Sequence, residues 1–106
     1  MSAYLFKLIP PRPDFAVTLS DKEKATMLEH AGYWGELASA GNTLAYGPVD
    51  DPSGGYGIGI VLADNLHDAE RIRDGDPVLR SSIGFRTEIF PMRRLVTPSA
   101  SYDPAG

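Results

Sequence analysis

Residues 56–63, YGIGIVLA, form the clearest strand pattern in the chain. Side chains alternate between the two faces of a strand, so every second residue belongs to the same face. One face of this segment is aliphatic and carries Ile58, Ile60 and Leu62. The other face consists of Gly57, Gly59, Val61 and Ala63. This second face is flat and small, which allows another element to approach the backbone closely.

Further strands are expected on both sides of this segment. A short strand over 43–46 ends at Gly47-Pro48, and the run DDPSGG at 50–55 reads as the loop that follows it. Residues 3–9, AYLFKLI, form a first strand with apolar side chains on both faces, which is typical of a strand covered on both sides. A last strand is expected over 85–92.

Capping residues and the helical spacing of apolar residues predict two helices. Ser20 and Glu23 form a capping box, in which each side chain accepts from the other residue's backbone amide, and the helix continues to about Ala40. Ala25, Leu28, Ala31 and Ala38 make one apolar stripe on it, and Met27, Trp34 and Leu37 make a neighbouring stripe. A second helix is expected over 66–74, with Asn65 as its N-cap and Gly75 at its end.

Two glycines interrupt the first predicted helix. Gly32 and Gly35 each cost about 1 kcal/mol in a helix interior. Their presence indicates either a close approach of another backbone or a break in the helix.

The order β-α-β-β-α-β is that of the split βαβ, or ferredoxin-like, fold, an α+β fold with an antiparallel sheet and both helices on one face. The opposite face of the sheet would then be bare, although its strands carry apolar or small residues. An apolar patch of that size indicates a partner. The simplest partner is a second copy of the chain, so we predict a homodimer that packs sheet to sheet.

Length and composition narrow the function classes. The chain has 106 residues, which suits one domain, and we place that domain at 1–95 with a flexible tail at 96–106. The net charge of −4 argues against nucleic-acid binding. The absence of cysteine excludes disulfides and thiolate chemistry. No stretch resembles a signal peptide or a membrane span, so we expect a cytoplasmic protein that does not bind membranes.

Two side chains are the best candidates for chemistry. His30 lies on the helix among apolar residues, either as a half-buried structural histidine or as a general acid or base. Asp76 precedes Pro77, which is common in turns, but a carboxylate bonded to His30 would fix the tautomer of the imidazole. His67 is expected to face solvent. The spacing of the histidines and acids supports no metal site, and we expect no cofactor.

The glycine-rich run at 54–59 is not a nucleotide-binding motif, because no helix begins after it.

The pattern H-x3-W-x2-L-x3-G-x2-L-x2-G-P, formed by His30, Trp34, Leu37, Gly41, Leu44 and Gly47-Pro48, resembles the core signature of the YciI-like (YCII-related) family. Asp76-Pro77 resembles its second signature, D-P-F, and the likeness spans roughly 3–95. It implies a dimeric α+β barrel with a His–Asp pair, here His30 and Asp76, in a cleft. Tyr33, Trp34, Gly47, Pro48 and Pro77 are then the residues expected to contact substrate.

Two positions depart from the family pattern. Val78 stands where an aromatic residue is usual, and Trp34 stands where leucine is usual. Both changes alter the expected shape of the pocket.

Three functions are consistent with the sequence. The first is a small enzyme of lyase, isomerase or hydrolase type, in which His30 is the general acid or base and Asp76 orients it. The second is a non-catalytic homodimer that binds a metabolite and serves regulation. The third is a monooxygenase on the same barrel, in its haem form with His30 as axial ligand, although no motif supports that role.

Overall fold

The computed structural model describes residues 1–104 of the chain. Its elements in chain order are β1 (Ser2–Ile9), η1 (Phe15–Val17), α1 (Asp21–Ser39), β2 (Thr43–Val49), β3 (Tyr56–Ala63), α2 (Leu66–Asp74), α3 (Pro77–Arg80), β4 (Arg86–Pro91), β5 (Leu95–Val96) and β6 (Ser101–Tyr102).

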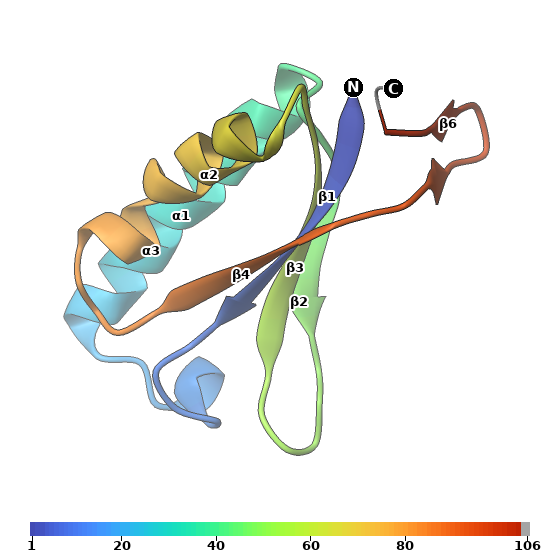
Figure 1. The fold of residues 1–106 in the computed structure, drawn as a ribbon. Helices are drawn as coiled ribbons and strands as arrows, with labels where there is room; N and C mark the ends of the chain where they lie inside the picture. The colour runs from blue at the N-terminus through green and yellow to red at the C-terminus, as the bar shows by residue number, and fades with distance from the viewer. Residues whose placement is uncertain (105–106) are drawn as a thin grey trace.

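Four strands form one antiparallel sheet in the order β2-β3-β1-β4, and the three α-helices pack on one face of it (Figure 1). This arrangement confirms the α+β fold and the βαββαβ order. The sequence did not indicate the turn η1, the one-turn helix α3 or the hairpin β5–β6, because each is shorter than the windows in which periodicity is visible.

The core lies between α1, α2 and the central strands. Its largest members are Phe6 of β1 and Trp34 of α1, whose rings meet edge to face with centroids 5.7 Å apart. Val61 of β3 and Ala69 of α2 complete the contact and are fully buried. Of the two stripes on α1, the one with Met27, Trp34 and Leu37 faces the sheet. The stripe with Ala25 and Leu28 faces solvent, where Leu28 is 76% exposed.

The two glycines in α1 cause neither a break nor a close approach. The helix runs unbroken from Asp21 to Ser39. A methyl group on Gly32 would meet nothing within 4 Å, and one on Gly35 would lie at an ordinary 3.8 Å from the Tyr46 hydroxyl. The close approach occurs instead at Gly59 of β3, where a Cβ atom would lie 2.6 Å from the ring of Trp34.

The segment between β1 and α1 is tied to the helix by Arg12. Its guanidinium donates to both carboxylate oxygens of Glu23, at 2.9 and 2.7 Å, and also to Thr18. The capping box between Ser20 and Glu23 is present as predicted. The hydrogen bonds from Arg12 and from the Ser20 amide lower the pKa of Glu23 to about 2, so this anchor keeps its charge down to strongly acid pH.

The sheet face opposite the helices carries an apolar row and is partly open, and Lys7 and Glu88 lie in the neighbouring row. Register places Leu5, Ile60 and Phe90 side by side on it, and Ile58 one position further along β3. Ile58 is 37% exposed and Phe90 is 46% exposed.

Residues beyond β4 form a small separate hairpin, in which Leu95 pairs with Tyr102 and Val96 with Ser101. It extends away from the helices (Figure 1). The tail expected at 96–106 therefore includes β6 and one of the two residues of β5, and its last two residues, 105 and 106, lie outside the described residues. Its mobility and the domain boundary at 95 stay predictions.

Gly59 should be the glycine of β3 that tolerates a side chain least. We expect Gly59→Ala to lower the free energy of unfolding by about 1–3 kcal/mol, because its methyl group overlaps the Trp34 ring. Gly57→Ala, on the same face of the same strand, is the matched control, since its Cβ would meet Leu8 at an ordinary 3.6 Å. Urea denaturation of both variants measures the difference. Equal stability of the two would contradict the assigned position of Trp34.

Candidate functional site

Asp76 is placed by the joint between two helices. Helix α2 ends at Gly75, and Asp76 is the N-cap of α3, with its Oδ1 accepting from the Val78 amide at 3.0 Å. Pro77 occupies the first turn of α3, where its missing N–H is not needed. The expectation that Asp76 serves a turn is therefore correct, and the same carboxylate also reaches across to α1.

The Asp76 carboxylate collects three donors. Nδ1 of His30 lies 2.9 Å from Oδ1 and 3.0 Å from Oδ2. Nε1 of Trp34 donates to Oδ2 at 2.7 Å. Together with the Val78 amide, these contacts leave the carboxylate, which is only 2% exposed, fully satisfied. We call Asp76, His30 and Trp34 the carboxylate cluster.

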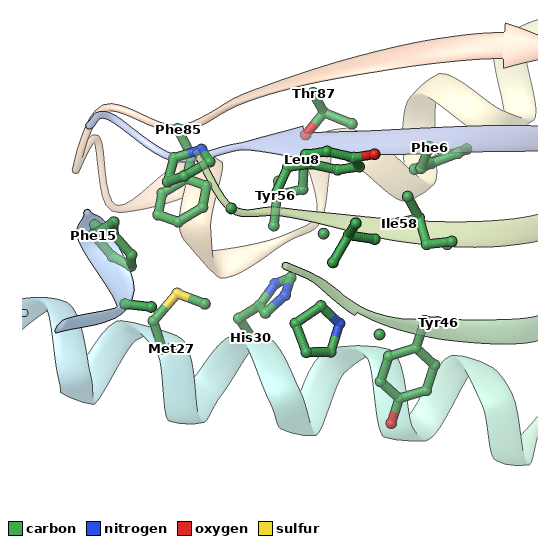
Figure 2. Close-up of a pocket in the computed structure, with 18 of the residues that line it drawn as sticks. Phe6, Leu8, Phe15, Met27, His30, Tyr46, Tyr56, Ile58, Phe85 and Thr87 are labelled. Carbon is green, nitrogen blue, oxygen red and sulfur yellow. The ribbon is translucent and has the colours of Figure 1, made fainter. Parts of the chain in front are cut away.

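This geometry determines which nitrogen of His30 is available. A carboxylate accepts hydrogen bonds and does not donate them, so the imidazole proton nearest Asp76 is on Nδ1. Nε2 is then the nitrogen that can accept or give a proton elsewhere. His30 lines a cavity and points from α1 toward the strands (Figure 2), with 18% of its side chain exposed. The arrangement can fix the orientation of the imidazole through its Nδ1.

The cavity lies between α1, the sheet and the segment that contains η1. Its volume is about 690 Å³, within the range of small-molecule sites. Phe15 and Phe85 stand at one end, ring centroids 4.9 Å apart, and Tyr46 stands toward the other (Figure 2). The strands contribute backbone from the glycine-containing face of β3, as the flat pattern at Gly57 and Gly59 suggested.

The residues predicted to contact substrate fall into two groups. Trp34, Gly47 and Pro48 line the cavity together with His30 and Asp76. Tyr33 and Pro77 are not among the lining residues. The Tyr33 hydroxyl donates to the Ile72 carbonyl at 2.6 Å, and its ring packs against Gly75, so it joins α1 to α2. Burial, and then the charge of Asp76, raise the pKa of Tyr33 and keep this donor protonated.

Sequence reasoning missed the bond between Trp34 and Asp76. The available signal was the spacing of four residues between His30 and Trp34, which places both side chains on one face of a helix. Sequence reasoning also missed Phe15 and Phe85, which come together only because the chain before α1 folds back beside β4. The structure puts His67 at the exposed start of α2, as expected.

The described residues contain neither a cluster of metal ligands nor a membrane-spanning helix. Across 1–104, no three acidic or histidine side chains gather as a metal ion would require. Within the same range, no helix has the length and apolar character needed to cross a membrane.

The fold and the site define a class of small α+β proteins with a histidine–carboxylate pair beside an apolar cavity. The model of the YCII-related domain matches residues 4–93. This match covers most of the chain, and the chain belongs to the YCII-related domain family. A comparison with curated proteins finds no match.

Removing the Asp76 carboxylate should change both stability and the state of His30. We expect Asp76→Ala to lower the free energy of unfolding by about 2–4 kcal/mol, since α3 loses its cap and buried donors lose their acceptor. In the wild type, long-range ¹H–¹⁵N spectra at a pH where His30 is neutral should show the proton on Nδ1. The variant should shift the proton toward Nε2.

The second histidine, His67, is an internal reference in the same spectra, because it is exposed and far from the cluster in sequence. A wild-type spectrum in which Nδ1 of His30 carries no proton would contradict the assigned hydrogen bond.

Proposed function

We propose that this protein is an enzyme that catalyses proton transfer on a small molecule, with His30 as general acid and base and Asp76 as the group that orients it. The observation that carries the proposal is the 2.9 Å contact between Nδ1 of His30 and Asp76, at the wall of a cavity of ligand size. A histidine that only capped a helix or filled the core would not need a buried carboxylate behind it that accepts hydrogen bonds from three donors.

The chemistry follows from the two faces of the imidazole. Nε2 takes a proton from a C–H or O–H of the substrate, and the positive charge that forms on the ring is stabilised by Asp76. Trp34 and the Val78 amide also donate to Asp76, and these hydrogen bonds hold the carboxylate in place behind the ring. The imidazolium then returns the proton to another atom of the substrate, as in an isomerase, or to a leaving group, as in a lyase.

Hydrogen exchange tests this function without a known substrate. A panel of small carbon acids, both uncharged and anionic, is incubated in D₂O at neutral pH, and ¹H NMR follows the loss of the acidic C–H signal. We expect the wild type to accelerate exchange in at least one compound and His30→Gln to lose roughly 10²-fold or more of that rate. His67→Gln is the control, since it removes the histidine outside the cavity. Equal rates in the His30 and His67 variants would exclude catalysis by His30.

A binding or regulatory role is the second candidate. The same cavity and carboxylate cluster could recognise a metabolite without turnover. Compounds that bind tightly beside His30 but show no exchange above the buffer rate would favour this role.

We also propose that the working unit is a homodimer joined through the open sheet face. The exposure of Ile58 and Phe90 beside Leu5 and Ile60 supports it, because four large apolar side chains in one patch are costly to leave in water.

Association of two copies of the chain should double the molecular mass measured in solution. We expect light scattering at micromolar concentration to give about twice 11.5 kDa, and Phe90→Glu to give the monomer, because burying a carboxylate among apolar side chains carries a large desolvation cost. Leu28→Glu, on the exposed side of α1, is the control and should remain dimeric. A wild type that scatters as a monomer would overturn the proposal.

A further inference from the structure

The cavity beside His30 has walls suited to a flat ring. Aromatic side chains from six parts of the chain line it: Phe6, Phe15, Trp34, Tyr46, Tyr56 and Phe85. Trp34 and Tyr46 lie with ring centroids 6.0 Å apart and an interplanar angle of 38°, so they form a continuous aromatic surface. Aromatic surfaces favour planar partners, which gain contact area and ring–ring attraction together.

Glycine backbone supplies a flat surface next to these rings. Gly57 and Gly59 of β3 and Gly47 of β2 line the cavity, and none of them carries a side chain that would project into it. At Gly59 the free space is taken by Trp34, which brings the indole ring down onto the strand. The result is a slot with flat walls, open enough for a molecule of one or two fused rings at a volume of about 690 Å³.

The charges around the slot disfavour an anionic ligand. Three carboxylates, those of Asp14, Asp50 and Asp51, line it in addition to Asp76. Hydrogen bonds from the hydroxyl and the amide of Ser53 lower the pKa of Asp51, so it is ionised at neutral pH.

The cations near the slot are already matched with acids. Nε of Arg12 lies 4.0 Å from Asp14, and the charge of Lys7 contributes to the lowered pKa of Asp51. Arg73 is the single arginine or lysine among the described lining residues. Its Nε lies 2.9 Å from Asp74, and its Nη1 lies 3.9 Å from Glu70, so its charge is already matched. A carboxylate or phosphate on the ligand would lose its hydration without gaining an unmatched cation, and an ammonium group would find Asp14 and Asp51 already beside basic side chains.

His30 offers a nitrogen for recognition, and the hydroxyl-bearing residues Tyr46, Tyr56 and Thr87 also belong to the lining. Nε2 of His30 is an acceptor when the ring is neutral, since Asp76 holds the proton on Nδ1. The inference rests on the proposed function for this role of His30. We propose that the ligand of this site is an uncharged planar aromatic compound whose hydroxyl group donates to Nε2 of His30, and that the site rejects the corresponding carboxylate.

A matched series of naphthalene derivatives tests the charge and the hydroxyl separately. The probes are 2-naphthalenemethanol, 2-naphthoate, 2-naphthylmethylammonium and 2-methylnaphthalene, each titrated into the wild-type protein at neutral pH by calorimetry. We expect the alcohol to bind at least about tenfold more tightly than the carboxylate, a preference of ~1.4 kcal/mol. We expect it to bind about three- to tenfold more tightly than the hydrocarbon, as one hydrogen bond allows.

Two sets of variants assign the preference to named groups. His30→Leu should remove the advantage of the alcohol over the hydrocarbon, and His67→Leu should keep it. The double variant Asp50→Asn/Asp51→Asn should tighten binding of the carboxylate. Glu36→Gln/Asp64→Asn, which changes the net charge equally at exposed positions away from the cavity lining, should not. Circular dichroism and thermal melting establish that each variant is folded. If His30→Leu does not fold, His30→Gln replaces it in the comparison.

The outcomes separate this inference from the proposed function. Tighter binding of the carboxylate or of the ammonium than of the alcohol overturns the inference, as does an alcohol preference that survives in His30→Leu. Hydrogen exchange that depends on His30 but occurs only on anionic acids would leave the proposed function standing and overturn this ligand class. Selective binding of the alcohol without any exchange would support the ligand class and exclude catalysis.

Discussion

The buried carboxylate of Asp76 is the constraint on which the site depends. A charged group with 2% exposure is tolerated only when donors surround it, and it finds them on two elements, α1 and α3. Each donor is useful in return. The Val78 amide begins α3, Trp34 is fixed in the core, and His30 receives a single orientation. One residue therefore joins local helix capping, core packing and the chemistry of the cavity.

The core and the cavity share the same side chains. Trp34 packs edge to face on Phe6, bonds to Asp76 and also forms part of the cavity wall. It can approach β3 only because Gly59 has no side chain. A protein of this size has few residues to divide between stability and function, so a single ring performs both tasks. The wall beside His30 is therefore part of the core, while the other end of the cavity is formed by the short turn η1.

Carboxylates occupy two places around the cavity. Asp76 lies behind His30 and accepts from its Nδ1, whereas Asp14, Asp50 and Asp51 line the cavity itself. The sheet face opposite the helices is distinct from both. Leu5, Ile60 and Phe90 form an apolar row on it, and the next row holds Ile58 beside Lys7 and Glu88.

The sequence by itself determined the order of the main elements, the caps at Ser20 and Asn65, and the two candidate groups His30 and Asp76, because periodicity, capping and turn chemistry act over a few residues. The tertiary structure alone decided that these two side chains meet across 46 positions, that Trp34 joins them, and that Tyr33 faces α2 instead of the cavity. It also placed Phe15 against Phe85 and moved the close glycine contact from α1 to Gly59. These are long-range contacts, and their geometry depends on how the helices lie on the sheet, which no local pattern encodes.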